Sequence, residues 1–71
     1  MTIRIEYCRV WNYHPRAVRL AATLKEKLQL ETQLVAGGRG AFEVFAEDRL
    51  LFSKLNEGRF PEEQEMVDLL R

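Results

Sequence analysis

The sequence predicts a small mixed α/β (α+β) domain whose elements run strand–helix–strand–strand–strand–helix, with a four-stranded mixed sheet. Three observations lead to this prediction. The first segment alternates apolar and polar residues with a period of two, which is typical of a strand. The second repeats its apolar residues with the period of a helix. Three short apolar segments then follow, separated by a glycine-rich run and an acidic turn.

The first strand is expected over residues 2–8. Its apolar side chains at positions 3, 5 and 7 share one face, while Cys8 shares the other with Arg4 and Glu6. This alternation predicts that the Cys8 thiol lies on the polar face, where solvent reaches it.

The first helix is expected over residues 15–29. Pro15 begins it, because the fixed φ and missing N–H of proline suit the first helical position. His14, which precedes the proline, is disfavoured in the α region. One apolar stripe then follows at helical spacing, formed by Ala17, Leu20, Ala21, Leu24 and Leu28. A strand–helix–strand unit within one sheet crosses over right-handed, so the first two strands are expected to be parallel.

The second, third and fourth strands are expected over residues 30–36, 41–46 and 50–54. The acidic turn between the last two predicts an antiparallel hairpin. A loop is expected at 56–58. Pro61 then begins the second helix, whose first turn carries two glutamates where the helix dipole favours anions.

Composition places the chain among globular proteins and bounds its function. Seventy-one residues allow one domain, 1–71. Eleven basic residues balance eleven acidic ones, which argues against a nucleic-acid partner, since such a partner calls for a basic face. No apolar stretch approaches the roughly 18 residues of a membrane span. Charges interrupt the apolar run at the N-terminus, so no signal peptide is expected and a cytoplasmic location is the default.

The charge is unevenly distributed along the chain. Residues 1–27 carry a net charge of +4 and the remainder −4, so the part of the chain around Cys8 is electropositive.

The chain has only one cysteine and one histidine. A single cysteine excludes an intramolecular disulfide, and one Cys with one His cannot form a four-ligand zinc site. We expect neither a metal nor a cofactor.

Cys8 is the strongest candidate nucleophile. A free thiol titrates near about 8.5, and nearby cations or a helix N-terminus lower that value. Arg9, His14 and Arg16 lie in or just after its loop, so these surroundings favour the thiolate. His14 is also a candidate general base. The alternative is a structural cysteine, because free cysteine is among the most buried residue types.

The run 37–40, Gly-Gly-Arg-Gly, is a candidate binding loop. The backbone N–H groups of Gly38 and Gly40 can cradle an anion, and Arg39 adds a positive charge. Next to Cys8, glycines would also let a substrate backbone approach closely. The run leads into a strand and not a helix, which excludes the dinucleotide-binding fingerprint. The alternative is a tight connection between two strands.

Residues 7–15, Tyr-Cys-Arg-Val-Trp-Asn-Tyr-His-Pro, resemble the redox loop of the selenoprotein W-like (Rdx) family, shared with selenoproteins T and H. Residues 38–44, 51–54 and 58–61 resemble later segments of that family, in the same order. The resemblance covers nearly the whole chain. It implies a thioredoxin-like two-layer sandwich, with a Cys-x-x-Cys or Cys-x-x-selenocysteine redox motif directly after the first strand.

Trp11 departs from this family pattern, because it occupies the position of the second redox residue and cannot carry that chemistry. Three explanations stay open. The second redox residue is lost, leaving a monothiol or a pure binding protein. Trp11 is instead the aromatic anchor of a binding surface. Or it replaces selenocysteine, whose codon UGA differs by one base from the tryptophan codon UGG.

The resemblance implies a thiol or selenol redox protein, with glutathione or a small protein thiol as partner and Cys8 as the reacting thiol. Arginines at positions 9, 16 and 39 are candidate partners for the carboxylates of glutathione. The rival hypothesis is a non-catalytic interaction module, with Arg9, Trp11 and Tyr13 as anchors. A third alternative, suggested by the small core, is a structural subunit stabilised by weak homo-oligomer formation.

Overall fold

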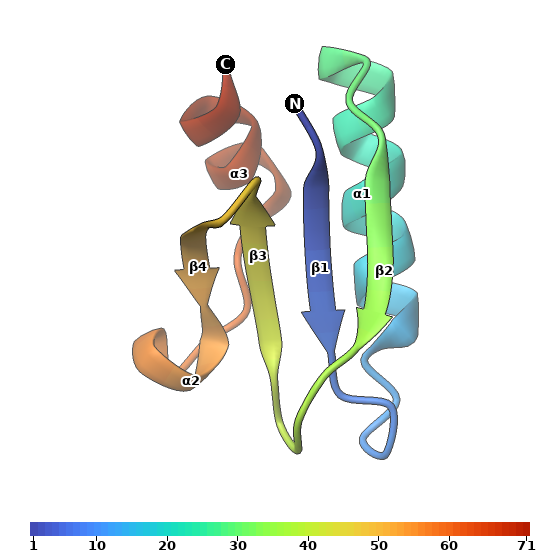
Figure 1. The fold of residues 1–71 in the computed structure, drawn as a ribbon, viewed down its shortest axis with the longest axis vertical. Helices are drawn as coiled ribbons and strands as arrows, with labels where there is room; N and C mark the ends of the chain where they lie inside the picture. The colour runs from blue at the N-terminus through green and yellow to red at the C-terminus, as the bar shows by residue number, and fades with distance from the viewer.

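The computed structural model describes residues 1–71 and contains one four-stranded sheet with helices packed on one face (Figure 1). The elements follow in the order β1 (Ile3–Tyr7), α1 (His14–Leu28), β2 (Thr32–Ala36), β3 (Phe42–Ala46), β4 (Arg49–Ser53), α2 (Lys54–Glu57) and α3 (Glu63–Leu70). The predicted mixed fold is confirmed, with α2 as an additional short helix. No helix has both the length and the apolar character that crossing a membrane requires.

The strand order in the sheet is β2-β1-β3-β4, so β1 lies inside the sheet with a neighbour on each side. β1 and β2 run parallel, as the right-handed crossover predicts, whereas β3 is antiparallel to both β1 and β4. Tyr7, the last residue of β1, pairs with Ala36 on one side and Phe42 on the other. The carboxyl ends of β1 and β2 therefore meet the start of β3 at one edge of the sheet (Figure 1).

A single apolar core lies between the sheet and the two longer helices. Ile3 and Ile5 are fully buried on the inner face of β1. They share one cluster with three residues of α1 (Ala17, Leu20 and Leu24), two of α3 (Met66 and Val67) and four of the strands β3 and β4 (Phe42, Val44, Ala46 and Phe52). Arg4 and Glu6 point to the other face and form an ion pair at 3.1 Å. The sheet is thus covered on one side only, which makes a two-layer sandwich.

Three helix boundaries differ from the sequence-based expectation. α1 ends at Leu28, one residue early, because Gln29 lies in the left-handed region with φ 55°. α1 begins at His14, one residue early, because the first N–H groups of a helix have no intrahelical partner and a proline is accepted throughout the first turn. α3 begins at Glu63 and not at Pro61. Glu62 before it is still extended, with φ −80° and ψ 145°.

The fourth strand also ends early, at Ser53, because a helical turn follows it. The Ser53 hydroxyl accepts a hydrogen bond from the Asn56 N–H at 3.2 Å and caps α2. Gly58, with φ 73°, ends α2 in the left-handed region. Lys54, which the sequence analysis placed in the strand, is therefore helical.

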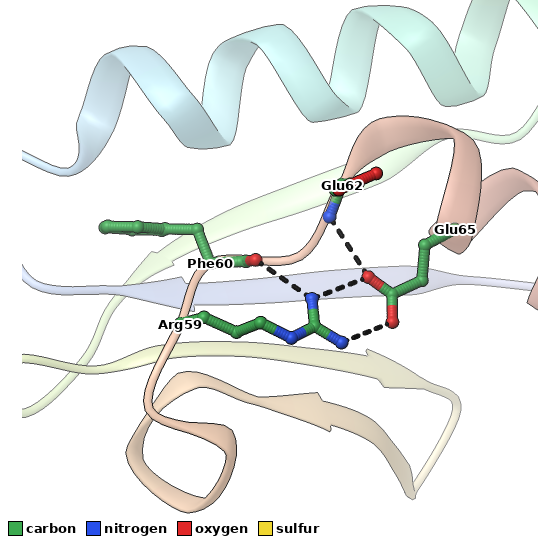
Figure 2. A network of polar contacts seen from close by, with 4 residues as sticks. All are labelled: Arg59, Phe60, Glu62 and Glu65. Carbon is green, nitrogen blue, oxygen red and sulfur yellow. Dashed lines mark hydrogen bonds and ion pairs between the residues drawn. The ribbon is translucent and has the colours of Figure 1, made fainter.

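Arg59 and Glu65 hold the start of α3 in place (Figure 2). The guanidinium donates two parallel hydrogen bonds to the carboxylate, from Nη1 to Oε1 at 2.9 Å and from Nη2 to Oε2 at 2.8 Å. The same Oε1 accepts from the Glu62 N–H at 3.1 Å, which caps the helix, and Arg59 Nη1 also donates to the Phe60 carbonyl at 3.2 Å. The hydrogen bonds from Arg59, and after them the bond from the Glu62 N–H, lower the pKa of Glu65 to about 2.

The Glu65 carboxylate should therefore stabilise the fold in a pH-dependent way. Its folded pKa lies below its unfolded value of about 4.3, so the contribution is complete above that value and is lost as the pH falls toward 2. Because the side chain is about one-third exposed, we expect Glu65→Gln to lower the free energy of unfolding by only about 1 kcal/mol at pH 7. Urea unfolding between pH 2 and 7 measures this, with Glu26→Gln, on the exposed side of α1, as the control. Equal losses in both variants at pH 7 would contradict the prediction.

Candidate functional site

Cys8 directly follows β1, and its backbone is bonded to both neighbouring segments. Its N–H donates to the Ala41 carbonyl at 2.8 Å, and its carbonyl accepts from the Tyr13 N–H at 3.1 Å. The first bond ties Cys8 to the chain entering β3, and the second ties it to the residue before α1. The position of the thiol is thus fixed by the sheet and by the first helix together.

Residues 9–12 form a tight turn that folds back over the Cys8 side chain. The Asn12 N–H donates to the Arg9 carbonyl at 3.0 Å, and Asn12 has φ 58°, in the left-handed region that asparagine tolerates better than most residues. The turn brings the Trp11 N–H to 3.4 Å from Cys8 Sγ, to which it donates. The backbone of the turn is therefore part of the environment of the sulfur.

Cys8 is buried, with only 1% of its surface exposed, so the expectation of a solvent-accessible thiol was wrong. The strand alternation from which that expectation came ends at Tyr7, and Cys8 lies beyond it. There the turn 9–12 and the chain around Gly40 enclose the side chain, which lies outside the main apolar cluster. The sequence analysis gave a buried structural cysteine as the alternative interpretation of Cys8, and its burial agrees with that. The sulfur is, however, surrounded by backbone N–H groups and not only by apolar atoms.

The environment of Cys8 has opposing effects on its ionisation. Burial alone raises the pKa of the thiol, because it removes water from the charged form. The N–H groups of Gly40, Trp11 and Val10 lower it, and the positive charge of Arg39 lowers it further. Together these outweigh burial, and the pKa lies below its ordinary value.

The glycine-rich run 37–40 contributes through two of its glycines. A Cβ on Gly40, which has φ 73°, would lie 3.0 Å from the Trp11 indole, so this position needs glycine for two reasons. Gly37 packs against β1, with a Cβ position 3.2 Å from that of Glu6, a contact that sequence reasoning missed. Gly38 has open space around it, and its carbonyl accepts a hydrogen bond from the Ala41 N–H at 3.1 Å.

The aromatic residues of the loop differ in exposure. Trp11 is 52% exposed, and its ring meets Tyr13 edge to face at 6.1 Å. Tyr13 packs on Phe60 at 4.7 Å and so belongs to the rim of the core. Val10, which the sequence analysis did not single out, is 77% exposed.

The remaining predicted residues lie in a second group beside the loop. Arg9 and His14 line a pocket of about 330 Å³ together with Tyr7 and Asn12, and we refer to it as the Arg9 pocket. The rings of Tyr7 and His14 lie 5.3 Å apart. Sequence reasoning missed Tyr7 and Asn12, although an asparagine at the end of a short loop is itself a turn signal.

The structure therefore divides the predicted site residues between two places. Arg39, Gly40 and Trp11 surround the sulfur, whereas Arg9 and His14 line the pocket. Arg16 belongs to neither, because its guanidinium stacks over the Phe60 ring at 4.0 Å. No three His, Cys, Asp or Glu side chains gather in a way that could hold a metal ion.

Comparison with known proteins identifies relatives of this chain. Residues 2–71 match the model of the Rdx family. The chain is 36% identical over 72 residues to migration and invasion enhancer 1 of Bos taurus and of Mus musculus, matching over 97% of its own length. It spans 61% of the length of these two relatives.

Two solved structures are similar over almost the whole chain. A protein from Bordetella parapertussis superposes with a TM-score of 0.91 and 29% identity, covering 99% of this chain and 92% of the other. A selenoprotein W-related protein from Vibrio cholerae superposes with a TM-score of 0.79 and 28% identity, covering 99% and 96%.

The charge of Arg39 should be measurable in the ionisation of Cys8. Arg39→Gln removes a cation that favours the thiolate, so we expect the pH midpoint of alkylation by iodoacetamide to rise. The midpoint of the unchanged protein should lie below that of an unstructured peptide of residues 7–12. Arg49→Gln, an exposed arginine of the β-hairpin, is the control and should leave the midpoint unchanged. A midpoint unaffected by Arg39→Gln would contradict the assigned role of this charge.

Proposed function

The chain belongs to the Rdx family, and we propose that it is a thiol redox protein that works through a mixed disulfide at Cys8. The observation that carries the proposal is the environment of the sulfur. A cysteine enclosed only for packing has a raised pKa, whereas that of Cys8 is lowered by backbone N–H groups and by Arg39. Such an environment stabilises the thiolate, which is the form of cysteine that reacts with disulfides.

The proposed reaction is reduction of a glutathionylated protein by thiol–disulfide exchange. The Cys8 thiolate attacks the glutathione sulfur of the mixed disulfide and forms a new S–S bond with it, while the sulfur of the protein substrate leaves as a thiolate and takes up a proton. Cys8 is thereby oxidised to a mixed disulfide. A second molecule of glutathione attacks that disulfide, regenerates the Cys8 thiolate and leaves as glutathione disulfide.

Trp11 decides how this chain would complete the reaction. The second redox residue of the Cys-x-x-Cys pattern is absent from this sequence, so Cys8 has no resolving partner within the loop. Reduction must then come from an external thiol, as in a monothiol mechanism, and a reducing compartment such as the cytoplasm supplies one.

The sulfur must become accessible during the reaction, because Cys8 is 1% exposed. The covering elements are the turn 9–12 and the contact between the Trp11 indole and Gly40. Trp11 is itself half-exposed and lies at the surface of the site, so a movement of this turn uncovers the sulfur at small cost to the core. We therefore expect Cys8 to react with disulfides more slowly than an exposed thiol of the same pKa.

Glutathione-dependent reduction of a glutathionylated peptide tests the proposal. The unchanged protein should accelerate this reaction at catalytic concentrations, and Cys8→Ser should not. A control variant, Arg49→Gln, should retain the rate. If the unchanged protein and Cys8→Ser give the same rate while both are folded by circular dichroism, the redox proposal is wrong.

A second candidate function is a non-catalytic docking loop, and the exposure of Val10 and Trp11 favours it. These two side chains are consecutive in the chain and are 77% and 52% exposed, so the turn presents two neighbouring apolar residues to solvent. In this case Cys8 has a structural role only. Trp11→Ser would then abolish partner binding, and Cys8→Ser would preserve it.

Replacing Trp11 by cysteine should create a dithiol site. The amide of residue 11 lies 3.4 Å from Cys8 Sγ, so a thiol at this position starts beside the sulfur. We expect Trp11→Cys to form an intramolecular disulfide in a glutathione redox buffer, and mass spectrometry after alkylation should find no free thiol in the oxidised form. Trp11→Ser is the control. Two separate glutathione adducts on Trp11→Cys would contradict this geometry.

A further inference from the structure

The Arg9 pocket contains three polar side chains that form no hydrogen bond or ion pair within the protein. The guanidinium of Arg9, the amide of Asn12 and the imidazole of His14 line it. The ion pairs of the chain join other residues: Arg4 to Glu6, Lys25 to Glu31 and Arg59 to Glu65. No acidic residue lines the pocket, whose fourth residue is Tyr7. Its donors are therefore free to bind an anion.

We propose that the Arg9 pocket binds a carboxylate of a small thiol peptide of the glutathione type, and so positions that peptide for reaction at Cys8. This inference rests on the proposed redox function and adds to it a binding site. Guanidinium donors match the two oxygens of a carboxylate and form charge-assisted hydrogen bonds with them. The Asn12 amide supplies a further N–H donor, and the His14 ring can supply another.

The pocket and the reacting residue belong to the same short segment of the chain. Tyr7 and Arg9 are the direct neighbours of Cys8, with Cα atoms about 3.8 Å away along the chain. Asn12 and His14 flank Tyr13, whose N–H is bonded to the Cys8 carbonyl at 3.1 Å. A peptide anchored by a carboxylate in this pocket is thus held against the loop that carries the sulfur.

The other positive groups near the loop fit this role less well. Arg16 stacks over Phe60 at 4.0 Å, and Arg39 acts on the sulfur itself. A larger hollow of about 600 Å³ beside α3 contains Arg59, but this guanidinium is already paired with Glu65. Glu62 and Asp68 also line that hollow and would repel an anion.

The size of the pocket favours a small peptide. A volume of about 330 Å³ is at the lower end of the range of small-molecule sites. It suits one end of a tripeptide, leaving the cysteine of that peptide outside to reach Cys8.

Binding of S-methylglutathione, which cannot form a disulfide, tests the subsite separately from the redox step. In an NMR titration of the full chain, we expect the amide signals of Arg9, Asn12 and His14 to shift and to saturate. Arg9→Gln should weaken binding about tenfold, because it removes the charged donor. Asn12→Asp keeps a residue that tolerates the left-handed backbone but adds a negative charge, and it should weaken binding at least as much. Arg49→Gln should bind like the unchanged protein.

Three binding results would overturn the inference: no saturable shift in the unchanged protein, equal affinity for Arg9→Gln, or equal affinity for an unrelated acetylated tripeptide with a free carboxyl end. The last would assign the pocket to protein C-termini. The redox proposal is tested independently. If the unchanged protein binds S-methylglutathione and the variants bind it more weakly, but Cys8 gives no turnover, the subsite is supported and the redox function is rejected. If turnover occurs and Arg9→Gln leaves its rate unchanged, the redox function is supported and the subsite is rejected.

Discussion

The pairing of β1 on both sides is the constraint on which the site depends. Since β2 and β3 hold the strand up to Tyr7, the next residue cannot swing out at the edge of the sheet. Its N–H is fixed to Ala41 and its carbonyl to Tyr13. The chain between Cys8 and α1 must therefore turn within a few residues, and it does so over the sulfur. The core beneath, from Ile5 to the two helices, anchors β1 and with it the position of Cys8.

Burial of a thiol normally disfavours its ionisation, and in this site backbone N–H groups compensate for that effect. Burial raises the pKa of Cys8, whereas N–H groups from the turn and from Gly40, aided by Arg39, lower it by more. The thiolate is thus stabilised by groups that the fold places there, largely independent of side-chain identity. Trp11 then has two consequences at once: its amide faces the sulfur, and its ring covers the adjoining Gly40. A chain with this pattern keeps one sulfur that is covered by the turn and has a lowered pKa, and in the proposed redox cycle it would depend on an outside thiol.

Local patterns were sufficient to predict most of the fold, and contacts between distant segments account for what was missed. The alternation in residues 3–7 and the apolar stripe of α1 identify their elements because each pattern reflects one buried face. The short helix α2 depends on a single cap, Ser53, and this cap was missed because it directly follows the apolar run of a strand. The burial of Cys8 could not be predicted from alternation, because the chain that encloses it includes residues 37–41, far along the sequence. For the same reason sequence reasoning grouped the arginines together, whereas folding assigns Arg9 and Arg39 to different surroundings.

The lowered pKa of Cys8 is tested most directly by following the Cβ carbon chemical shift of the selectively labelled residue as the pH is raised. The folded protein should titrate at a lower pH than the same protein unfolded in urea, because unfolding removes the backbone N–H groups and Arg39 from the sulfur. A folded-state midpoint equal to or above the unfolded one would contradict this prediction, and Cys8 would then be a packing residue.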